Sequence, residues 1–263
     1  MNHQHPLIDN WGVKPVLFHL GTIPVSSYSF FVSLGIIAGA LIYYFEARKQ
    51  RQVNEHSFLI AVGALAGAAL GAKLLEILIN VDNIESLNSL AAFLLSGRTI
   101  IGGLIGGTLG AMLTKKILHI QTKKGNLFAP AIALGVAIGR IGCFFNGCCY
   151  GQPTKLPWAI NFGDGIMRHP TQLYESLFML AMFIILKTQF KHKPVKPGYL
   201  FKVLMIWYFI FRFFVEFIRV ERIAFWHLTY FQIIAIFVLL YLVLDDIKLL
   251  IIKLIENGRK EYI

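Results

Sequence analysis

The stretch Leu127–Gly151, LFAPAIALGVAIGRIGCFFNGCCYG, decides the fold class of this chain. Residues 127–147 are long and apolar enough to cross a hydrocarbon core of ~30 Å as one helix, which takes about 20 residues. Arg140 lies near the end of this segment, and three cysteines follow it closely. A charged side chain at membrane depth is costly, so Arg140 is a candidate for a functional site.

The composition of the whole chain indicates an integral membrane protein. Of its 263 residues, 56% are hydrophobic and 15% are charged, whereas about a quarter of the residues in an average soluble domain are charged. Apolar segments of spanning length predict an all-α fold with seven transmembrane helices, at about 26–46, 57–80, 99–118, 127–147, 171–190, 199–218 and 227–246.

The distribution of Lys and Arg between these segments predicts the orientation. One set of connections is rich in basic residues: Arg48, Lys49, Arg51, Lys115, Lys116, Lys123, Lys124, Lys187, Lys191, Lys193, Lys196, Lys248, Lys253, Arg259 and Lys260. The other set holds only Lys14, Arg98, Lys155, Arg168, Arg219 and Arg222. The positive-inside rule therefore places the N-terminus outside and the C-terminus in the cytoplasm. The net charge of +11 fits this topology and contact with anionic membrane lipids, and we predict no nucleic-acid partner.

The chain is expected to form a single transmembrane domain over 1–263. Two longer connections, 81–98 and 148–170, are predicted as outer loops, and the glycines and prolines of the second favour turns over strands. Apolar and charged residues alternate over about 246–263, which predicts a cytoplasmic interfacial helix.

Glycines recur at every fourth position in the second and third predicted spans, as at Gly63, Gly67 and Gly71. This spacing is typical of close helix packing. Gly102 and Gly103 stand near the outer end of the third span, where the absence of side chains would let a lipid headgroup approach the backbone.

Several charges fall in the outer half of the predicted membrane. Arg212 and Glu216 are one turn apart and can neutralise each other, as can Lys73 and Glu76. Glu175 lies in the first turn of the fifth span. Arg140 can alternatively extend to the surface. Because Arg140 and Arg212 share a depth, we expect them to converge on one cavity, where two guanidinium forks suit a phosphate.

In combination these residues resemble the prolipoprotein diacylglyceryl transferase family, along nearly the whole chain. The matching blocks are Pro15-Val16 with Gly21 and Tyr28; Gly102–Gly106; Gly139–Gly142 with Phe144, Asn146-Gly147 and Gly151; Arg168–Glu175; Phe211-Arg212, Val215–Phe217 and Arg219; and Leu228-Thr229 with Gln232. No single block is specific for the family, but the whole series of blocks in this order, in a chain with seven predicted spans, is specific for it.

The resemblance implies an enzyme of the bacterial plasma (inner) membrane. Such an enzyme transfers the diacylglyceryl group of phosphatidylglycerol to the lipobox cysteine of a preprolipoprotein signal peptide. Glycerol phosphate is released, and neither a cofactor nor a metal is required. An outer-facing lipid cavity built from spans one, three, four and six is implied. The catalytic candidates are Arg140, Arg212, Glu216 and His169, and the substrate-binding candidates are Tyr28, Gly102, Gly103, Asn146 and Gly151.

Three positions depart from the family pattern. Ile101 replaces a histidine, Cys143 an asparagine and Cys148 a glutamate. An acceptor thiol attacks as a thiolate, so a base or a lowered thiol pKa is required. His169 is the remaining histidine candidate on the outer side, although a histidine before Pro170 can equally cap the helix or anchor the loop. These departures keep a divergent paralogue with another acceptor open as an alternative.

The three cysteines, Cys143, Cys148 and Cys149, leave four interpretations open. They can be small buried hydrophobic residues, or Cys143 and Cys148 can form a disulfide. They can form a soft-ligand site with His169, although no zinc-like spacing is present. Finally, one thiol can itself accept a lipid or acyl group. A non-catalytic lipid- or metal-binding thiol sensor is therefore a further alternative function.

Overall fold

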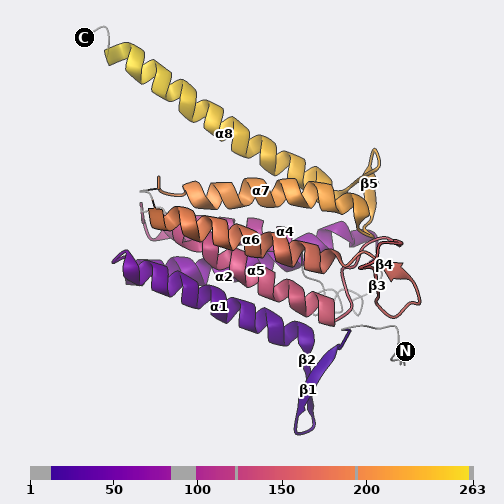
Figure 1. Cartoon of the computed structure of the whole chain (residues 1–263). Coiled ribbons are helices and arrows are strands. Elements are labelled where there is room, and N and C mark those ends of the chain that lie inside the picture. Colours follow the sequence, from indigo (N-terminus) through magenta and orange to yellow (C-terminus); the bar gives the residue numbers. More distant parts are fainter. Residues whose placement is uncertain (1–12, 84–98, 122–123, 193–194, 261–263) are drawn as a thin grey trace. The chain divides into compact units, whose positions relative to one another are not determined.

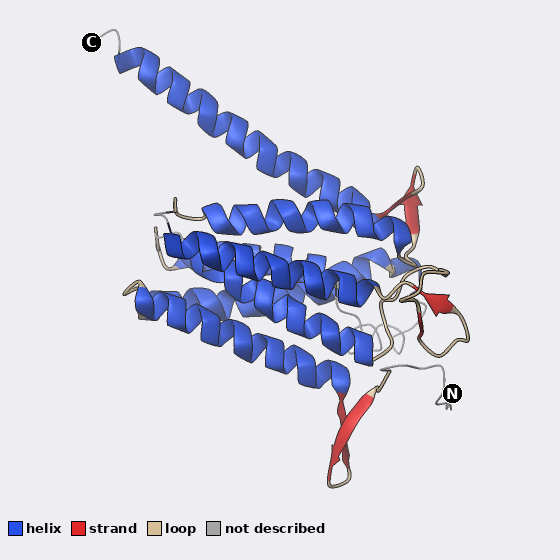
Figure 2. Cartoon of the chain, in the orientation of Figure 1, coloured by secondary structure: helices blue, strands red, loops and turns tan. Residues whose placement is uncertain are grey.

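The computed structural model describes residues 13–83, 99–121, 124–192 and 195–260. The fold is predominantly helical (Figures 1 and 2). The chain forms two compact units, one containing residues up to 43 and from 125 onward, and the other containing residues 44–124. The candidate site lies in the first unit.

The first unit contains the helices α5 (Gly125–Phe145), α6 (Thr171–His192), α7 (Tyr199–Val215) and α8 (Tyr230–Lys260), together with most of α1 (Ser27–Lys49). Helix α5 packs against both α6 and α7, and α7 packs against α8. Helix α5 is the central element of this arrangement, since its buried residues run from Leu127 to Phe144 and include Arg140.

Small residues allow α1 to lie directly against α5. A Cβ atom added at Gly35 would stand 2.5 Å from the carbonyl oxygen of Gly135, and one at Gly142 would stand 2.8 Å from the Cβ of Phe31. Side chains larger than glycine would therefore separate the helices. This contact places the start of α1, including Tyr28, beside the end of α5.

The second unit is built on α2 (Glu55–Ile79) and α4 (Ile100–Ile117), with the short 3-10 helix η1 (Val81–Asn83) after α2. The glycine repeats meet face to face: a Cβ at Gly67 would lie 2.3 Å from the oxygen of Gly106. The expectation of close packing is therefore confirmed. Asn54 and Thr99 cap the two helices by accepting hydrogen bonds from the amides of Ser57 and Gly102.

Three short hairpins lie at one end of the first unit, at the right in Figure 2. They pair β1 (Val16–Leu20) with β2 (Ile23–Ser26), β3 (Ile160–Asn161) with β4 (Met167–Arg168), and β5 (Ile223–Phe225) with β6 (Leu228–Thr229). Helices α5 and α7 end there, and α1, α6 and α8 begin there (Figure 1).

The expectation of turns without strands in 148–170 is wrong. The side-chain oxygen of Asn161 accepts hydrogen bonds from the amides of Gly163 (2.8 Å) and Gly165 (3.1 Å). Both glycines have positive φ, which glycine adopts without steric cost. The resulting tight turn brings β3 and β4 into antiparallel register.

Helices occupy each of the seven predicted segments. By length and composition, α1, α2, α4 and α5 could cross a membrane. Helix α8 continues to Lys260, so residues 246–260 are helical as expected but belong to the same helix as the preceding segment. Most of the predicted loop 81–98, together with residues 261–263, lies outside the described residues.

Candidate functional site

The candidate site centres on one carboxylate that two arginines share. Glu175, in the first turns of α6, accepts from Arg140 of α5 at 2.6 Å and from Arg212 of α7 at 3.5 Å, through the same oxygen, Oε2. Its other oxygen accepts a 2.9 Å hydrogen bond from the hydroxyl of Tyr208. The side chain of Glu175 is fully buried, and those of Arg140 and Arg212 are 6% and 4% exposed. Three helices are thus joined by ionic contacts inside the unit.

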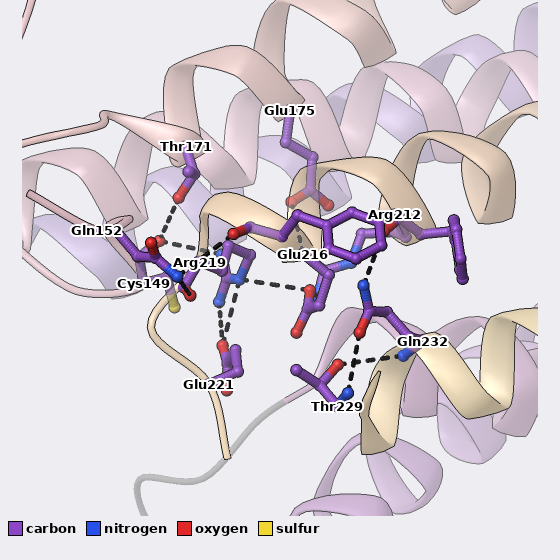
Figure 3. Close-up of polar contacts among 12 residues, drawn as sticks. Cys149, Gln152, Thr171, Glu175, Arg212, Glu216, Arg219, Glu221, Thr229 and Gln232 are labelled. Carbon is purple, nitrogen blue, oxygen red and sulfur yellow. Dashed lines mark hydrogen bonds and ion pairs between the residues drawn. The ribbon is translucent and has the colours of Figure 1, made fainter. Parts of the chain in front are cut away.

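The network continues beyond the end of α7, through the 3-10 helix η2 (Glu216–Ile218) (Figure 3). Glu216 Oε2 lies 2.7 Å from Arg212 Nη2 and 3.7 Å from Arg219 Nε. Arg219 also pairs with Glu221 at 2.5 Å. The contacts form an alternating series of cations and anions, which is how buried charges are normally compensated.

The charges in this network do not cancel in its buried part. Three arginine side chains are at most 6% exposed and face two carboxylates, Glu175 and Glu216, that are wholly buried, whereas the third carboxylate, Glu221, keeps 25% exposure. In the described part of the chain, Nε of Arg140 and of Arg212 also makes no hydrogen bond, and neither does the buried Oε1 of Glu216. The buried region therefore has a surplus of positive charge and unused N–H donors, which are the properties an anionic ligand requires.

Backbone carbonyls of the turn after α5 accept hydrogen bonds from side chains in and beside this network. The carbonyl of Cys149 accepts hydrogen bonds from Thr171 Oγ1 (2.7 Å) and Arg219 Nη1 (3.0 Å) (Figure 3). The carbonyl of Cys148 accepts one from Gln172 Nε2 (2.5 Å). Cys149 itself has a left-handed φ of 62°, which is uncommon outside glycine. The start of α6 and Arg219 thus hold a backbone conformation that the turn would otherwise seldom adopt.

The three cysteines cluster at this turn as free thiols. Their Sγ atoms lie within 4.8 Å of one another, and Arg140 Nη1 is 3.9 Å from the sulfur of Cys143. Hydrogen bonds from the Cys143 and Cys148 thiols, helped by the nearby guanidinium groups of Arg140 and Arg219, hold the pKa of the Cys149 thiol well below its usual range. The cluster therefore favours thiolate formation at one of its members.

His169 belongs to a separate polar cluster. Its Nδ1 lies 3.2 Å from the hydroxyl of Tyr174, which accepts a 2.8 Å hydrogen bond from Trp158 Nε1. Because an indole N–H only donates, the Tyr174 hydroxyl remains able to donate to His169. Trp158 and Tyr174 also line a mostly apolar cavity of about 540 Å³ between the 148–170 loop and the start of α6.

The structure brings together three of the four predicted catalytic candidates, Arg140, Arg212 and Glu216. Arg140 and Arg212 converge as expected, but on the carboxylate of Glu175. The cavity expected between them stays a prediction. The ring of His169 faces Tyr174, and within the described residues no hydrogen bond or ion pair joins it to the arginines. Its role as a base stays a prediction.

The predicted substrate-binding residues occupy different surroundings. Gly151 pairs with Arg219 as an isolated β-bridge, and a Cβ there would stand 2.5 Å from the oxygen of Ile218. Asn146 directly follows α5. Gly102 and Gly103 belong to the second unit, where Gly102 fits against Gly71 and Leu75. Gly102 therefore serves helix packing, and headgroup contact with this pair stays a prediction.

Sequence reasoning underrated Glu175 and omitted Arg219, Tyr208 and Gln172 from the site. Glu175 and Arg219 both stand within segments that carry the family resemblance. Their position in these segments is the sequence signal that points to them as site residues. Nothing in the local sequence around Tyr208 indicates its hydrogen bond, because its partner lies on another helix.

Comparison with known proteins agrees with this pattern. The family model described as prolipoprotein diacylglyceryl transferase matches residues 15–244. The chain is similar to the phosphatidylglycerol–prolipoprotein diacylglyceryl transferase of Clostridium tetani, with 36% identity over 216 residues, which cover 79% of this chain and 86% of the relative. The protein of the same name from Finegoldia magna is 34% identical over 236 residues, covering 89% and 94%. That of Clostridioides difficile is 32% identical over 226 residues, covering 84% and 89%.

Proposed function

The chain belongs to the prolipoprotein diacylglyceryl transferase family, and on that premise we propose that its buried arginine network binds phosphatidylglycerol for transfer of the diacylglyceryl group to a prolipoprotein. The protein is a transferase of lipoprotein modification. The acceptor is the thiol of the lipobox cysteine in the signal peptide. In the reaction a sulfur–carbon bond forms, the carbon–oxygen bond to the phosphate breaks, the thiol loses its proton and glycerol phosphate leaves.

One observation carries the assignment of the site: guanidinium groups from two helices, Arg140 and Arg212, meet in a buried region with surplus positive charge. The departing phosphate gains negative charge as the carbon–oxygen bond breaks. Fixed cations stabilise such a charge strongly where water is excluded. Glu175 and Glu216 hold the two arginines in position, so little reorganisation is needed when the charge develops.

The departures from the family pattern bear on thiol activation. Ile101 is an apolar residue that is 1% exposed and cannot act as a base. The surplus positive charge at Arg140 can instead lower the pKa of the incoming acceptor thiol. In this account His169, which directly precedes Pro170 and α6, and Tyr174, in the first turn of α6, lie beside the apolar cavity, where the signal peptide would approach.

The hairpin end of the first unit is the outer face in this proposal. Helices α1, α2, α4, α5, α6, α7 and α8 form seven spans of the bacterial inner membrane, with the N-terminus outside. Four of these helices are long and apolar enough to cross a membrane, by length and composition. The excess of Lys and Arg in alternate connections supports the orientation.

Labelling of single cysteines tests this topology. In a background with the native cysteines replaced by serine, Lys155→Cys is expected to react with an impermeant maleimide added to intact spheroplasts. Lys116→Cys should react only after lysis. Both native residues are exposed, so reactivity reports the side of the membrane rather than burial. The reverse pattern would place the proposed site on the cytoplasmic face.

A direct assay tests the function. The purified chain in detergent, given phosphatidylglycerol and a peptide with a lipobox cysteine, is expected to increase the peptide mass by one diacylglyceryl group and to release glycerol phosphate. The matched control is the same peptide with serine in place of that cysteine, which should stay unmodified. Failure to modify the thiol peptide, by a protein that binds phosphatidylglycerol, would favour the paralogue with another acceptor.

A further inference from the structure

The cysteine cluster has a chemistry that lipid transfer does not use. We propose that Cys143, Cys148 and Cys149 form a three-sulfur binding site for a soft, thiophilic cation of the Cu(I) type. The site lies in the turn after α5, at the edge of the arginine network. The proposal rests on the arrangement of these thiols and holds whether or not the chain acts as a transferase.

The geometry of the thiols carries the proposal. All three Sγ atoms lie within 4.8 Å of one another. Metal–sulfur bonds of about 2.3 Å, as for zinc, place the sulfur atoms of one coordination shell roughly 4 Å apart. The three thiols therefore require only small side-chain rotations to share one ion. These are all the cysteines of the chain, and among the described residues no histidine, aspartate or glutamate joins the group.

The kind and number of donors favour Cu(I) over zinc. Thiolates are soft ligands and select soft cations. Structural zinc almost always takes four protein ligands, whereas the described residues offer three here and no fourth from histidine or a carboxylate. Cu(I) is stable with three thiolates alone.

The surrounding charge is compatible with such a complex. Three thiolates and one monovalent cation carry a net negative charge, which needs compensation when partly buried. Arg140 Nη1 lies 3.9 Å from the sulfur of Cys143, and Arg219 is bonded to the carbonyl of Cys149. These guanidinium groups would stabilise the anionic complex, although they would repel a bare cation.

The backbone holds the donors in place before any ion arrives. Cys149 has a left-handed φ, and its carbonyl is bonded to both Thr171 and Arg219. The carbonyl of Cys148 is bonded to Gln172. Cys143 is fixed by the end of α5 and is buried, whereas Cys149 is exposed. The site is therefore preorganised and open to an ion from solvent.

A competition titration tests the proposal. The reduced full-length chain in detergent, kept anaerobic, is given Cu(I) held by the chromophoric chelator bicinchoninate. We expect the chain to withdraw one equivalent of Cu(I) and to release protons as the thiols ionise. X-ray absorption at the copper edge should show three sulfur neighbours and no nitrogen.

Matched variants identify the ligands. Cys149→Ser, at the exposed position, is expected to weaken Cu(I) binding more than about 100-fold, since even outer-shell partners of a metal site are worth 10–100-fold. Cys148→Ser should do the same. Met167→Leu, which removes an exposed soft thioether from β4, should bind Cu(I) as the unaltered chain does.

Stability gives a second readout that does not depend on the chelator. Cu(I) should raise the thermal unfolding midpoint of the unaltered chain and leave that of Cys149→Ser unchanged, because a ligand that binds the native state stabilises it. The proposal is overturned if the fully reduced chain withdraws no Cu(I), if Cys149→Ser binds equally well, or if Zn(II) saturates the site and Cu(I) does not.

Discussion

Replacing Arg140 by methionine is expected to lower the rate of diacylglyceryl transfer by at least about 10²–10³-fold, the usual cost of removing one preorganised donor to a developing negative charge. Methionine keeps much of the apolar volume and removes the charge and all N–H donors. The rate is measured with the peptide assay at saturating phosphatidylglycerol, so that loss of lipid binding does not account for the change.

A compensated variant separates this effect from damage to the fold. Arg140→Met alone leaves Glu175 with the longer, 3.5 Å ion pair to Arg212 and the neutral hydrogen bond from Tyr208. Arg140→Met combined with Glu175→Gln removes one charge of each sign, so the excess of positive charge in the buried region stays the same. The double variant is expected to recover stability and to remain inactive. Recovery of transfer in this variant would show that Arg140 serves folding alone.

Arg140→Lys provides the graded control. Lysine keeps the positive charge but lacks the planar fork that binds two oxygens at once. We expect a rate between those of the unaltered chain and of Arg140→Met. A lysine variant with full activity would mean that charge alone is sufficient and that fork geometry contributes nothing.

The parts of the fold that follow from local patterns were predictable from sequence. Helical segments follow from apolar runs of spanning length, and the pairing of Arg212 with Glu216 follows from their spacing of one turn. The close packing of α2 on α4 follows from glycines at every fourth position. In each case the interacting groups are a few residues apart or repeat with the period of a helix.

Contacts between distant segments were predicted less well. The convergence of Arg140 and Arg212 was expected from their shared depth, yet Glu175 was assigned no place between them, because depth does not define which face of a helix a side chain occupies. The thiol cluster also depends on contacts between distant segments. Cys143 stands five positions before Cys148 in the sequence. The backbone turn after α5, which Thr171 and Arg219 hold by hydrogen bonds, brings the sulfur atoms together.

Glu175→Gln is expected to destabilise the folded protein by about 3–5 kcal/mol, because removing one partner of a buried ion pair leaves the other charge uncompensated. Two arginines lose their shared carboxylate at once, since both contact Oε2 of Glu175. For a chain of this size the thermal midpoint should fall by roughly 10 °C. Scanning fluorescence in detergent measures the shift.

The neighbouring residue supplies the control. Ser176 donates a 2.8 Å hydrogen bond to the carbonyl of Ala137, and Ser176→Ala removes one neutral hydrogen bond from the same turn of α6. Its expected cost is about 0.5–1.5 kcal/mol, which is well below that of Glu175→Gln. Equal midpoints for the two variants would mean that Glu175 contributes no more than an ordinary polar contact. The arginines would then be compensated chiefly through Glu216, and the centre of the network would lie at the end of α7 rather than between α5 and α6.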